Sequence, residues 1–250
     1  IGQGLARGLS EAMGVVTKVA PLDDVPTDAD PGWCTSAVHA SVAASLRQLR
    51  TDRVDALLLH RSQDWDKGAG AVRRALLSLR DEGTCRVVGV SVGNVPELVA
   101  ALQDAECGYV QLPFNLLDWR WTSPEVSDIL ASRPDVVVTC RSVFLQGLLL
   151  GDEQLAWPSN CGVGPSEVLG PLHKLVDELG RVSVADLCIA YVLGHPWATS
   201  VVLGADTPRQ VRETASVARR KPLDHDQIVH VRQNLPHVDE TLLDPARWTW

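Results

Sequence analysis

Lys18 is the first residue in this sequence whose position suggests chemistry. It lies in the segment GVVTKVAP, residues 14–21, where apolar and β-branched residues predict a short buried strand with Lys18 near its C-terminal end. Most lysines in such a place extend their stems along apolar surface and keep the ammonium in water. An ammonium retained at a buried strand end would instead indicate a charge that acts on a neighbouring group. The other strand ends bear on the choice between these two interpretations.

Polar side chains recur at or just after the ends of the other apolar runs. These runs are buried-strand candidates: GVVTKVA with Lys18, RVDALLLH ending at His60, CRVVGVSV ending at Val92, GYVQLPF ending at Phe114, DVVVTCRSVF ending at Phe144 and TSVVLGA ending at Ala205. The polar residues at these ends are Lys18, His60, Ser91, Asn94, Gln111, Asn115, Arg141 and Ser142. Converging on one face, they would form a polar site at the C-terminal ends of the strands.

Segments with helical spacing separate the strand candidates. Apolar residues recur at helical intervals in residues 35–50, 71–83, 95–105 and 123–133. Gly83 is placed to end a helix, and Pro96 and Pro124 fall where first helical turns accept proline. Helices alternating with nearly continuous apolar strands predict a parallel sheet.

Composition excludes several classes of function. The chain has 250 residues, of which 45% are hydrophobic and 22% charged, so it is an ordinary globular sequence. Its net charge of -8 and its lack of a basic run argue against a nucleic acid or an anionic membrane as partner. No segment has the length of a membrane span or the pattern of a secretory signal. We expect a cytoplasmic protein with one domain over residues 1–250, in which 218–250 form a C-terminal helix and tail.

The cysteines and histidines give no metal signature. The six cysteines form no CxxC pair, so neither a zinc site nor a disulfide framework is indicated, and we expect reduced, mostly buried thiols. The remaining histidines form no HExxH pattern and receive no chemical role. Of the eight tryptophans, several fall in loop-like segments, and we expect some of these to line an opening for substrate.

Two architectures fit the alternation of strands and helices. An open doubly wound sheet would bind a nucleotide through a glycine-rich turn after its first strand, and GQGLARG, residues 2–8, is the only candidate. Its glycine spacing is wrong, no strand precedes it, and LARGLSEAM, residues 5–13, has a helical pattern. A closed (β/α)8 TIM barrel predicts polar residues at the C-terminal ends of several strands, which is the pattern found here.

Six ordered segments resemble the aldo-keto reductase superfamily. They are VVTKV, SLRQLRTDRVDALLLH, LRDEGTCRVVGVSVGN, QLPFNLLD, RSVFLQGLLLG and VVLGADTPRQVRETASV, and together they run from about residue 1 to residue 217. The sequences QLPFNLLDWR and RSVFLQGLLL most resemble the bacterial branch of this superfamily, which is associated with sugar-related pathways. The resemblance implies an α/β barrel that reduces carbonyl groups with a nicotinamide cofactor bound across its mouth.

The resemblance assigns catalytic roles to Lys18 and His60. The family uses a tyrosine as general acid, a lysine and an aspartate that tune it, and a histidine that orients the carbonyl. Lys18 matches the lysine and His60 matches the histidine. An ammonium beside a phenol lowers its pKa, and an imidazole can donate a hydrogen bond to the oxygen that becomes negative during hydride transfer.

The stretch that carries the aspartate and tyrosine in the family is absent from these residues. The sequence has two tyrosines, Tyr109 in a strand candidate and Tyr191 in a helical segment, and neither matches the catalytic position. Six strand candidates are present where a closed barrel has eight. We therefore expect a chain that lacks an N-terminal segment, with a degenerate member of the family as the alternative.

The resemblance also implies a set of cofactor-binding residues. Ser91 and Gln111 would hydrogen-bond the nicotinamide carboxamide with help from Asn94, Arg141 stands where relatives place a stacking tyrosine, and Gly147 would let the backbone approach the pyrophosphate. An Asp206 or Thr207 cap with Pro208 in the first turn predicts a helix N-terminus that suits a phosphate. The complete set is Ser91, Asn94, Gln111, Arg141, Ser142, Phe144, Gln146, Gly147, Gly204, Asp206, Thr207, Arg209, Gln210 and Thr214.

The sequence thus predicts an NADP-dependent oxidoreductase that acts on an aldehyde, a ketone or a sugar carbonyl. NADP is preferred over NAD because Arg209 or Arg212 could contact an adenosine phosphate; the alternative for Arg209 is a solvated helix residue. Two other functions stay open. One is a cofactor-binding or regulatory subunit without turnover, and the other is a non-redox enzyme with Lys18 and His60 as acid-base groups.

Overall fold

The strands follow the six apolar runs. The computed structural model describes residues 1–8, 13–26, 28–152 and 154–250. The described strands are β1 (Val16–Val19), β2 (Val54–Leu59), β3 (Cys85–Ser91), β4 (Tyr109–Pro113), β5 (Val137–Arg141) and β6 (Ser200–Val201). They form one sheet in chain order, and the registers of β1–β2, β2–β3, β3–β4 and β5–β6 are parallel. The predicted parallel α/β fold of TIM-barrel type is therefore confirmed.

Two strands end earlier than predicted. β5 ends at Arg141 rather than Phe144, because Ser142 has a φ of 60° and a left-handed residue cannot continue a strand. β6 covers only Ser200 and Val201, although the Val202 N–H still donates to Cys140 O at 2.8 Å. The sequence pattern counted the loop residues that follow as strand because they are apolar.

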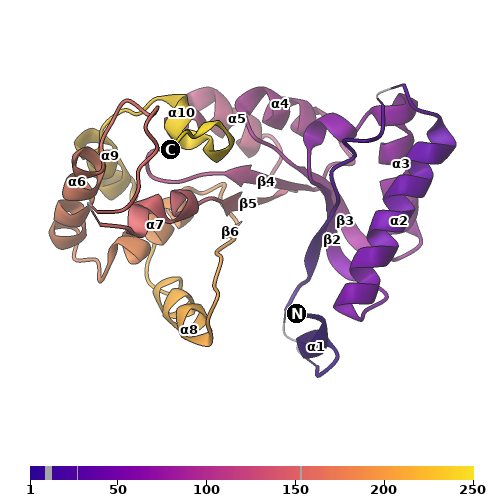
Figure 1. The fold of residues 1–250 in the computed structure, drawn as a ribbon, viewed down its shortest axis with the longest axis horizontal. Coiled ribbons are helices and arrows are strands. Elements are labelled where there is room, and N and C mark those ends of the chain that lie inside the picture. Colours follow the sequence, from indigo (N-terminus) through magenta and orange to yellow (C-terminus); the bar gives the residue numbers. More distant parts are fainter. Residues whose placement is uncertain (9–12, 27, 153) are drawn as a thin grey trace. The chain divides into compact units, whose positions relative to one another are not determined.

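Helices occupy the predicted intervals. The α-helices are α1 (Gly2–Leu5), α2 (Pro31–Leu49), α3 (Lys67–Asp81), α4 (Val95–Gln103), α5 (Pro124–Ala131), α6 (Pro165–Glu178), α7 (Val184–Leu193), α8 (Pro208–Val217), α9 (His225–Asn234) and α10 (Glu240–Leu243) (Figure 1). Short 3-10 turns are η2 (Ser62–Asp64), η3 (Trp119–Thr122), η4 (Leu145–Leu150) and η5 (Pro245–Arg247). The helix predicted over residues 5–13 is not found in the described residues: α1 ends at Leu5 and residues 6–8 form a turn, while residues 9–12 lie outside the described part of the chain.

Local capping explains several helix boundaries. Asp30 begins α2 by accepting from the N–H groups of Gly32 and Trp33. After α3, Gly83 has a φ of 82° and its N–H donates to Arg80 O at 2.9 Å, as expected for a glycine that ends a helix. Pro96 and Pro124 stand in the first turns of α4 and α5. The predictions made for Gly83, Pro96 and Pro124 are confirmed, whereas the Asp30 cap was not predicted.

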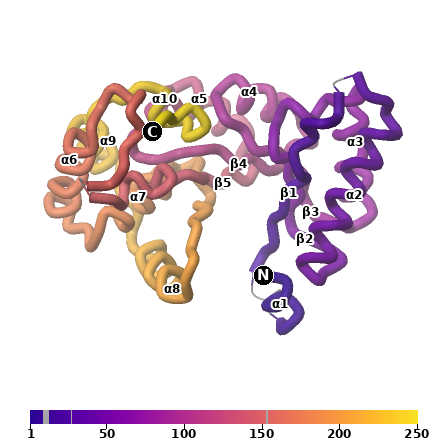
Figure 2. Tube along the Cα trace, viewed as in Figure 1, coloured from indigo at the N-terminus to yellow at the C-terminus, as the bar shows by residue number. Residues whose placement is uncertain are grey.

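The chain divides into two compact units. Unit 1 contains residues 1–112 and 132–137, and unit 2 contains residues 113–131 and 138–250. Figure 2 shows their Cα traces, and in unit 1 the helices α2 and α3 run side by side along β1 to β3. No described helix combines the length and apolar character needed to cross a membrane.

The two faces of the sheet in unit 1 differ. Toward the C-terminal ends of β1 to β4, one set of alternating residues is buried and apolar: Val19, Leu57, Leu59, Val88, Val90, Val110 and Leu112. Residues of the other parity form a cluster in which buried Ala56, Leu58 and Tyr109 pack with Val87 and Val137. Because side chains alternate along a strand, this second face also carries Lys18, Ser91 and Gln111 at its C-terminal end.

Gly89 sets the separation of β3 and β4. It pairs in register with Tyr109, and a Cβ at position 89 would lie 1.8 Å from Tyr109 O and 2.8 Å from Tyr109 Cβ. No side chain fits there without moving β4. The absence of a side chain at Gly89 therefore allows the register that also places Ser91 opposite Gln111.

Gly89→Ala should destabilise the protein by at least about 1–3 kcal/mol, because the methyl group collides with backbone. Gly93→Ala is the matched control, since a Cβ there would meet only Glu97 Oε2 at 3.8 Å. The free energy of unfolding of Gly93→Ala should stay within about 0.5 kcal/mol of that of wild type. Urea unfolding followed by circular dichroism measures both; equal stabilities for the two variants would show that the β3–β4 spacing is not limited by Gly89.

Candidate functional site

Parallel register brings four of the predicted residues to one face of unit 1. Lys18 pairs with Leu58, which pairs with Gly89, and Gly89 pairs with Tyr109. Two residues further along each strand, the same face carries Ser91 on β3 and Gln111 on β4, which are register partners. His60 directly follows β2 and has the same parity as Leu58. The carboxyl ends of β1 to β4 therefore carry an amine, an imidazole, a hydroxyl and an amide.

These polar side chains differ in exposure. Ser91 is 5% exposed and Gln111 is 6% exposed, so both are buried polar groups at strand ends. Lys18 is half-buried, whereas His60 is exposed. A half-buried Lys18 on the polar face fits a charge that acts within a site better than a lysine that leads fully into solvent.

Asn94 is engaged in helix capping. Its Oδ1 accepts from Glu97 N at 2.9 Å, and its Nδ2 donates to Glu97 Oε1 at 2.9 Å. The side chain thereby begins α4 directly after the loop that follows β3. Any contact of Asn94 with a ligand would compete with this cap.

A buried ion pair fixes the loop that follows β1. Lys67 Nζ lies 2.8 Å from Asp64 Oδ1 and also donates to Leu22 O at 2.6 Å. Leu22 N in turn donates to Asp64 Oδ2 at 3.4 Å, and Arg61 pairs with Asp23. These contacts tie the segment after Lys18 to the segment after His60, so they hold the two strand ends in a constant arrangement.

In unit 2, the residues predicted to follow a pyrophosphate form a tight loop. Ser142, Leu145, Gln146 and Gly147 all have positive φ, with values of 60°, 46°, 55° and 91°. Such values are uncommon outside glycine. The loop is closed by its own hydrogen bonds, since Leu145 N donates to Ser142 O and Gly147 N donates to Phe144 O, both at 2.9 Å.

Neighbouring groups hold this loop in place. Phe114 N donates to Arg141 O at 2.9 Å, and buried Asn115 donates through Nδ2 to Ser142 O at 3.4 Å. Arg141 Nη1 donates to Ser142 Oγ at 3.4 Å. Phe114 and Asn115, directly after β4, thus support the start of the loop after β5.

A pocket of about 550 Å³ lies in unit 2 beside α8. It contains four of the residues predicted to bind cofactor, namely Phe144, Gly204, Gln210 and Thr214. The other lining residues were not predicted, and they are Leu150, Ser183, Ala185, Glu213, Ser216 and Val217. Apolar walls with a few hydrogen-bonding groups are typical of a site for a small molecule or cofactor.

The N-terminus of α8 is capped as predicted. Thr207 Oγ1 accepts from Gln210 N at 3.2 Å, Pro208 occupies the first turn, and Gln210 Oε1 accepts from Thr207 N at 3.0 Å and Asp206 N at 2.8 Å. The side-chain carbonyl oxygen of Gln210 is thus engaged. The N–H groups of its side-chain amide are therefore the donors that Gln210 can offer a ligand.

Two of the lining residues that the sequence analysis missed on α8, Glu213 and Val217, could have been found from helical spacing. Gln210, Glu213, Thr214 and Val217 are separated by three or four positions, so they share one face of the helix. Applying this spacing to Gln210 and Thr214 would have added Glu213 and Val217. Leu150, Ser183 and Ala185 come from other elements and carry no such signal.

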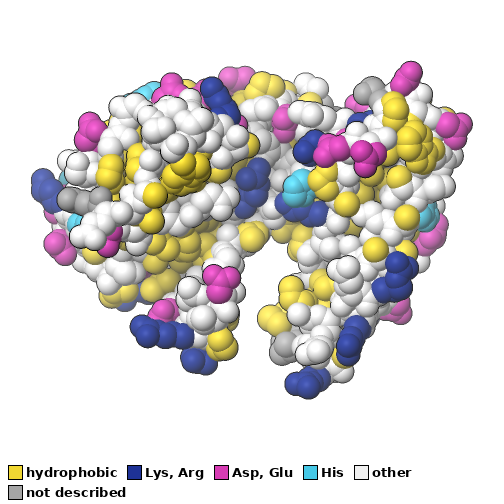
Figure 3. All heavy atoms as spheres, viewed as in Figure 1, with side chains coloured by type: hydrophobic (Ala, Val, Ile, Leu, Met, Phe, Trp, Pro, Cys, Tyr) yellow, Lys and Arg dark blue, Asp and Glu magenta, His cyan; other side chains and the backbone are white. Residues whose placement is uncertain are grey.

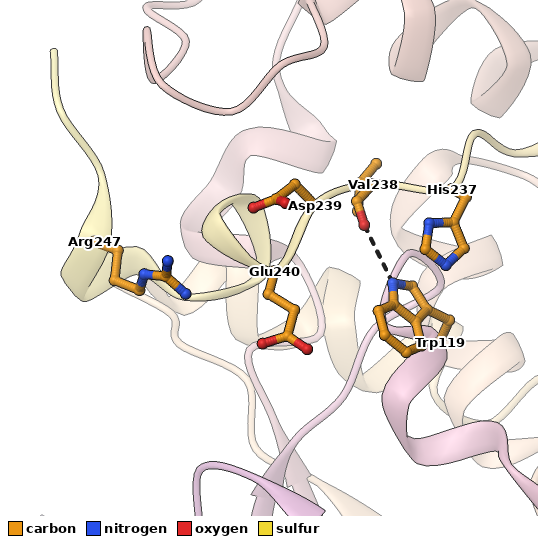
Figure 4. Close-up of a pocket in the computed structure, with 6 residues that line it drawn as sticks. All are labelled: Trp119, His237, Val238, Asp239, Glu240 and Arg247. Carbon is orange, nitrogen blue, oxygen red and sulfur yellow. Dashed lines mark hydrogen bonds between the residues drawn. The ribbon is translucent and has the colours of Figure 1, made fainter.

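A second pocket, of about 500 Å³, is lined by Trp119, His237, Val238, Asp239, Glu240 and Arg247 (Figure 4). The indole of Trp119 stacks on His237 with ring centroids 4.7 Å apart, and its Nε1 donates to Val238 O at 3.2 Å. Buried Asp118, paired with Arg120, anchors the turn that carries Trp119. Trp119 therefore lines a pocket with polar walls, and a role for this pocket as the substrate opening stays a prediction.

His195 lies in an aromatic cluster in unit 2. Its ring is 4.8 Å from that of Phe114 and 5.0 Å from that of Tyr191, and Nδ1 lies 2.9 Å from Tyr191 O. Burial lowers the pKa of His195 below its usual value. Burial also raises the pKa of Tyr191. His195 is thus a structural residue, in agreement with the absence of a predicted role.

The cysteines are structural as well. All six are free and buried, which confirms the prediction of buried thiols. Burial raises the pKa of Cys85 to about 11 and that of Cys107 to about 11. Such thiols stay protonated at neutral pH and are poor nucleophiles.

A parallel α/β sheet with polar groups at its strand ends, and a pocket beside the helix after the last strand, define a barrel-type enzyme. The sequence model of the Aldo/keto reductase family matches residues 1–235, and the chain belongs to this family. It is therefore an NAD(P)H-dependent oxidoreductase. The match begins at residue 1 and so gives no support to the predicted lack of an N-terminal segment.

Individual relatives agree with this family. The chain is 25% identical over 222 residues to the uncharacterized oxidoreductase YqkF of Bacillus subtilis, covering 83% of this chain and 71% of that protein. It is 28% identical over 235 residues to 6-dehydroglucose reductase of Agrobacterium fabrum, covering 88% and 72%. The holo form of the aldo-keto reductase AKR11C1 from Bacillus halodurans has the same fold, with a TM-score of 0.74, 22% identity and coverage of 98% and 79%.

His195 should make stability depend on pH below neutrality. Since its folded-state pKa is lowered, the stability it contributes is present above about pH 6.5 and is lost as pH falls through the folded-state pKa, at a slope of at most about 1.4 kcal/mol per pH unit. His195→Gln should flatten this part of the profile, whereas His173→Gln, at an exposed position of α6, should not. Urea unfolding between pH 7 and pH 5 measures the slopes; parallel slopes for wild type and His195→Gln would contradict the assignment.

Proposed function

We propose that this protein reduces an aldehyde, a ketone or a sugar carbonyl with NAD(P)H, and that Lys18 and His60 act at the carbonyl group. The observation that carries the proposal is the pocket beside α8. Four residues chosen from the sequence as cofactor ligands, Phe144, Gly204, Gln210 and Thr214, line this one pocket. Residues so far apart in the chain would not meet in one lining by local sequence alone.

The donor set of unit 2 fits a dinucleotide. The pocket volume of about 550 Å³ and its apolar walls Leu150 and Val217 suit an adenosine. Gly147, with a φ of 91° and open space where a Cβ would lie, would let a pyrophosphate approach the backbone. The amide of Gln210 and the hydroxyl of Ser183 can donate hydrogen bonds to the adenosine. When bound, the nicotinamide cofactor supplies the hydride.

The strand ends of unit 1 supply the groups for the carbonyl and the nicotinamide. Ser91 and Gln111, buried register partners, would hydrogen-bond the carboxamide. His60 would donate to the carbonyl oxygen and so stabilise the negative charge that develops there. The ammonium of Lys18 favours the ionised form of an acid beside it, which lowers the pKa of a general acid.

Three further features of the function can be proposed: the substrate class, the cellular compartment and the preferred cofactor. A relative named 6-dehydroglucose reductase supports a sugar carbonyl as the substrate class. The unpaired, buried thiols support a reducing compartment, so we propose a cytoplasmic protein that forms one barrel domain. NADP as the preferred cofactor would depend on Arg209 or Arg212 reaching the adenosine.

A cofactor-binding role without turnover is the second candidate. The two tyrosines of the sequence, Tyr109 and Tyr191, are both buried, at 8% and 1% exposure. Tyr191 lies within an aromatic cluster, and burial raises its pKa, which opposes a role in proton transfer at neutral pH. This observation favours a site that binds the nucleotide without donating a proton from a tyrosine of these residues.

Val217→Trp should weaken NAD(P)H binding at least about tenfold, because a large ring at this position fills part of the pocket. Val211→Trp is the matched control, as Val211 is on the same helix, 54% exposed and outside the described lining. Isothermal titration calorimetry with NADH and NADPH measures both. Undiminished affinity in Val217→Trp would place the cofactor elsewhere.

Lys18→Met should leave NAD(P)H affinity nearly unchanged and reduce the rate of hydride transfer. The methionine preserves the packing of the stem but removes the charge, so the pKa of the general acid rises. Each unit of that rise makes proton transfer less favourable by about 1.4 kcal/mol. Lys174→Met, at an exposed lysine of α6, should change neither quantity. Stopped-flow single turnovers beside cofactor titrations separate the outcomes: equal loss of binding and rate would make Lys18 structural, and binding without any wild-type turnover would favour the second candidate.

A further inference from the structure

A cavity of unit 1 has no role in the proposed reaction. It has a volume of about 340 Å³ and lies among η2, α4, β3 and the N-terminal end of α3. Val90 of β3 lines it, and the side chain of Val90 is on the opposite face of the strand from that of the adjacent Ser91. The sheet therefore separates this cavity from the polar side chains at the strand ends.

The buried part of the lining is apolar and fixed. Trp65, Val90 and Cys107 are 9%, 2% and 1% exposed. The indole of Trp65 is held in place because its Nε1 donates to Asp104 Oδ2 at 3.0 Å, and the same oxygen lies 2.6 Å from Arg73 Nε. A wall that is already in place loses little conformational freedom when a ligand binds, so the cavity is preorganised.

Small side chains on α4 leave room for the cavity. Pro96, Glu97, Ala100 and Ala101 line it, and their spacing of one turn places them on one side of the helix. A volume of 340 Å³ is near the lower end of the range of roughly 300–1,000 Å³ found for ligand sites. The cavity therefore suits a molecule with a single ring.

Ser62 brings an unsatisfied hydroxyl group to the lining. Its Oγ is buried, and it has no hydrogen-bond partner in the described part of the chain. Leaving a buried polar atom unpaired costs free energy. A hydroxyl oxygen can accept hydrogen bonds, so a donor on a ligand would supply the partner that Ser62 lacks.

The charge of the lining is negative. The carboxylates of Asp66 and Glu97 belong to it, and none of its described residues is a lysine or an arginine. Charge is balanced on α8, where Figure 3 shows basic and acidic side chains together and Arg209 Nε lies 2.6 Å from Glu213 Oε1. A cavity lined by one sign of charge attracts a ligand of the opposite sign, which here is a cation.

Asp66 is the carboxylate best placed to pair with that cation. The two oxygens of Glu97 accept from Gly93 N at 2.8 Å and from Asn94 Nδ2 at 2.9 Å. Buried Asp64 is already paired with Lys67. Asp66, in contrast, is exposed, and its side chain forms no cap although it stands directly before α3.

The surface beside the cavity carries the same sign of charge. A wider depression of about 620 Å³ adjoins the cavity and shares Trp65, Asp66 and Ala100 with it. Its described lining adds two carboxylates, those of Asp104 and Glu106, and one guanidinium. A cation that approaches the cavity therefore meets an attractive field before it binds.

We propose that this cavity binds a small arylalkylamine, with its ring against Trp65 and Val90 and its ammonium group paired with Asp66 and donating to Ser62 Oγ. An ammonium group offers three donors and no acceptor, which matches a carboxylate beside an unpaired hydroxyl oxygen. The proposal does not rest on the proposed function, because the residues that carry it are separate from Lys18, His60 and the pocket beside α8.

The test compares 2-phenylethylamine with its neutral counterpart 2-phenylethanol. NMR titrations follow the indole N–H signals, and the signal of Trp65 is identified by its absence from Trp65→Phe. In wild type the amine should shift the Trp65 signal in a saturable way. It should bind at least about threefold more tightly than the alcohol, which is the effect of a partly exposed ion pair.

Ala100→Phe should weaken binding of 2-phenylethylamine at least about tenfold, because the new ring occupies the cavity. Ala40→Phe is the matched control, since Ala40 is exposed on α2 and outside the described lining. Ser62→Ala should weaken binding about threefold without lowering the stability of the protein, because it removes a buried hydroxyl that has no partner among the described residues.

Asp66→Asn should make the affinities for the amine and the alcohol nearly equal. Asp52→Asn removes the same charge at an exposed position outside the described lining and should leave the difference unchanged. A Trp65 signal that does not move, equal wild-type affinities for the two probes, or undiminished binding to Ala100→Phe would each overturn the inference. Circular dichroism verifies that every variant is folded.

Discussion

The register of the parallel strands is the constraint on which unit 1 depends. Because Gly89 has no side chain, β4 approaches β3 so closely that a methyl group there would touch the backbone of Tyr109. The same register pairs Ser91 with Gln111 and places Lys18 and Leu58 in one row. A shift of one residue would turn all these side chains to the apolar face, so the polar strand ends exist only in this register.

Unit 2 obtains its site from tight turns and caps. Positive φ angles after Ser142 curl the chain directly after β5, and Asn115 holds the start of that curl through Ser142 O. The Thr207 cap begins α8 directly after the sheet and presents one face of the helix to Phe144 and Gly204 in a single pocket. Backbone conformations that cost free energy, such as a positive φ outside glycine, are found where a ligand-binding loop has to keep a fixed shape.

Charge in the two units is arranged differently. In unit 1, carboxylates such as Asp64 are buried and matched by cations such as Lys67, which fixes loops rather than leaving charge for a ligand. On α8, Glu213 and Arg209 are exposed, so their pairing costs little to rearrange and the carboxylate still faces the pocket.

The sequence by itself determined the parallel α/β fold, the six strands, most helix boundaries, the Thr207 cap and the family. These follow from hydrophobic period, glycine and proline positions and ordered motifs, all of which act over short distances along the chain. Only the tertiary structure decided that Asn94 caps α4, that β5 stops at Arg141, and that Leu150, Ser183 and Glu213 share a lining with Gln210. Apolar residues in strands and in tight loops look alike in sequence. The meeting of Leu150 and Ser183 with one face of α8 depends on packing between distant segments rather than on a local pattern.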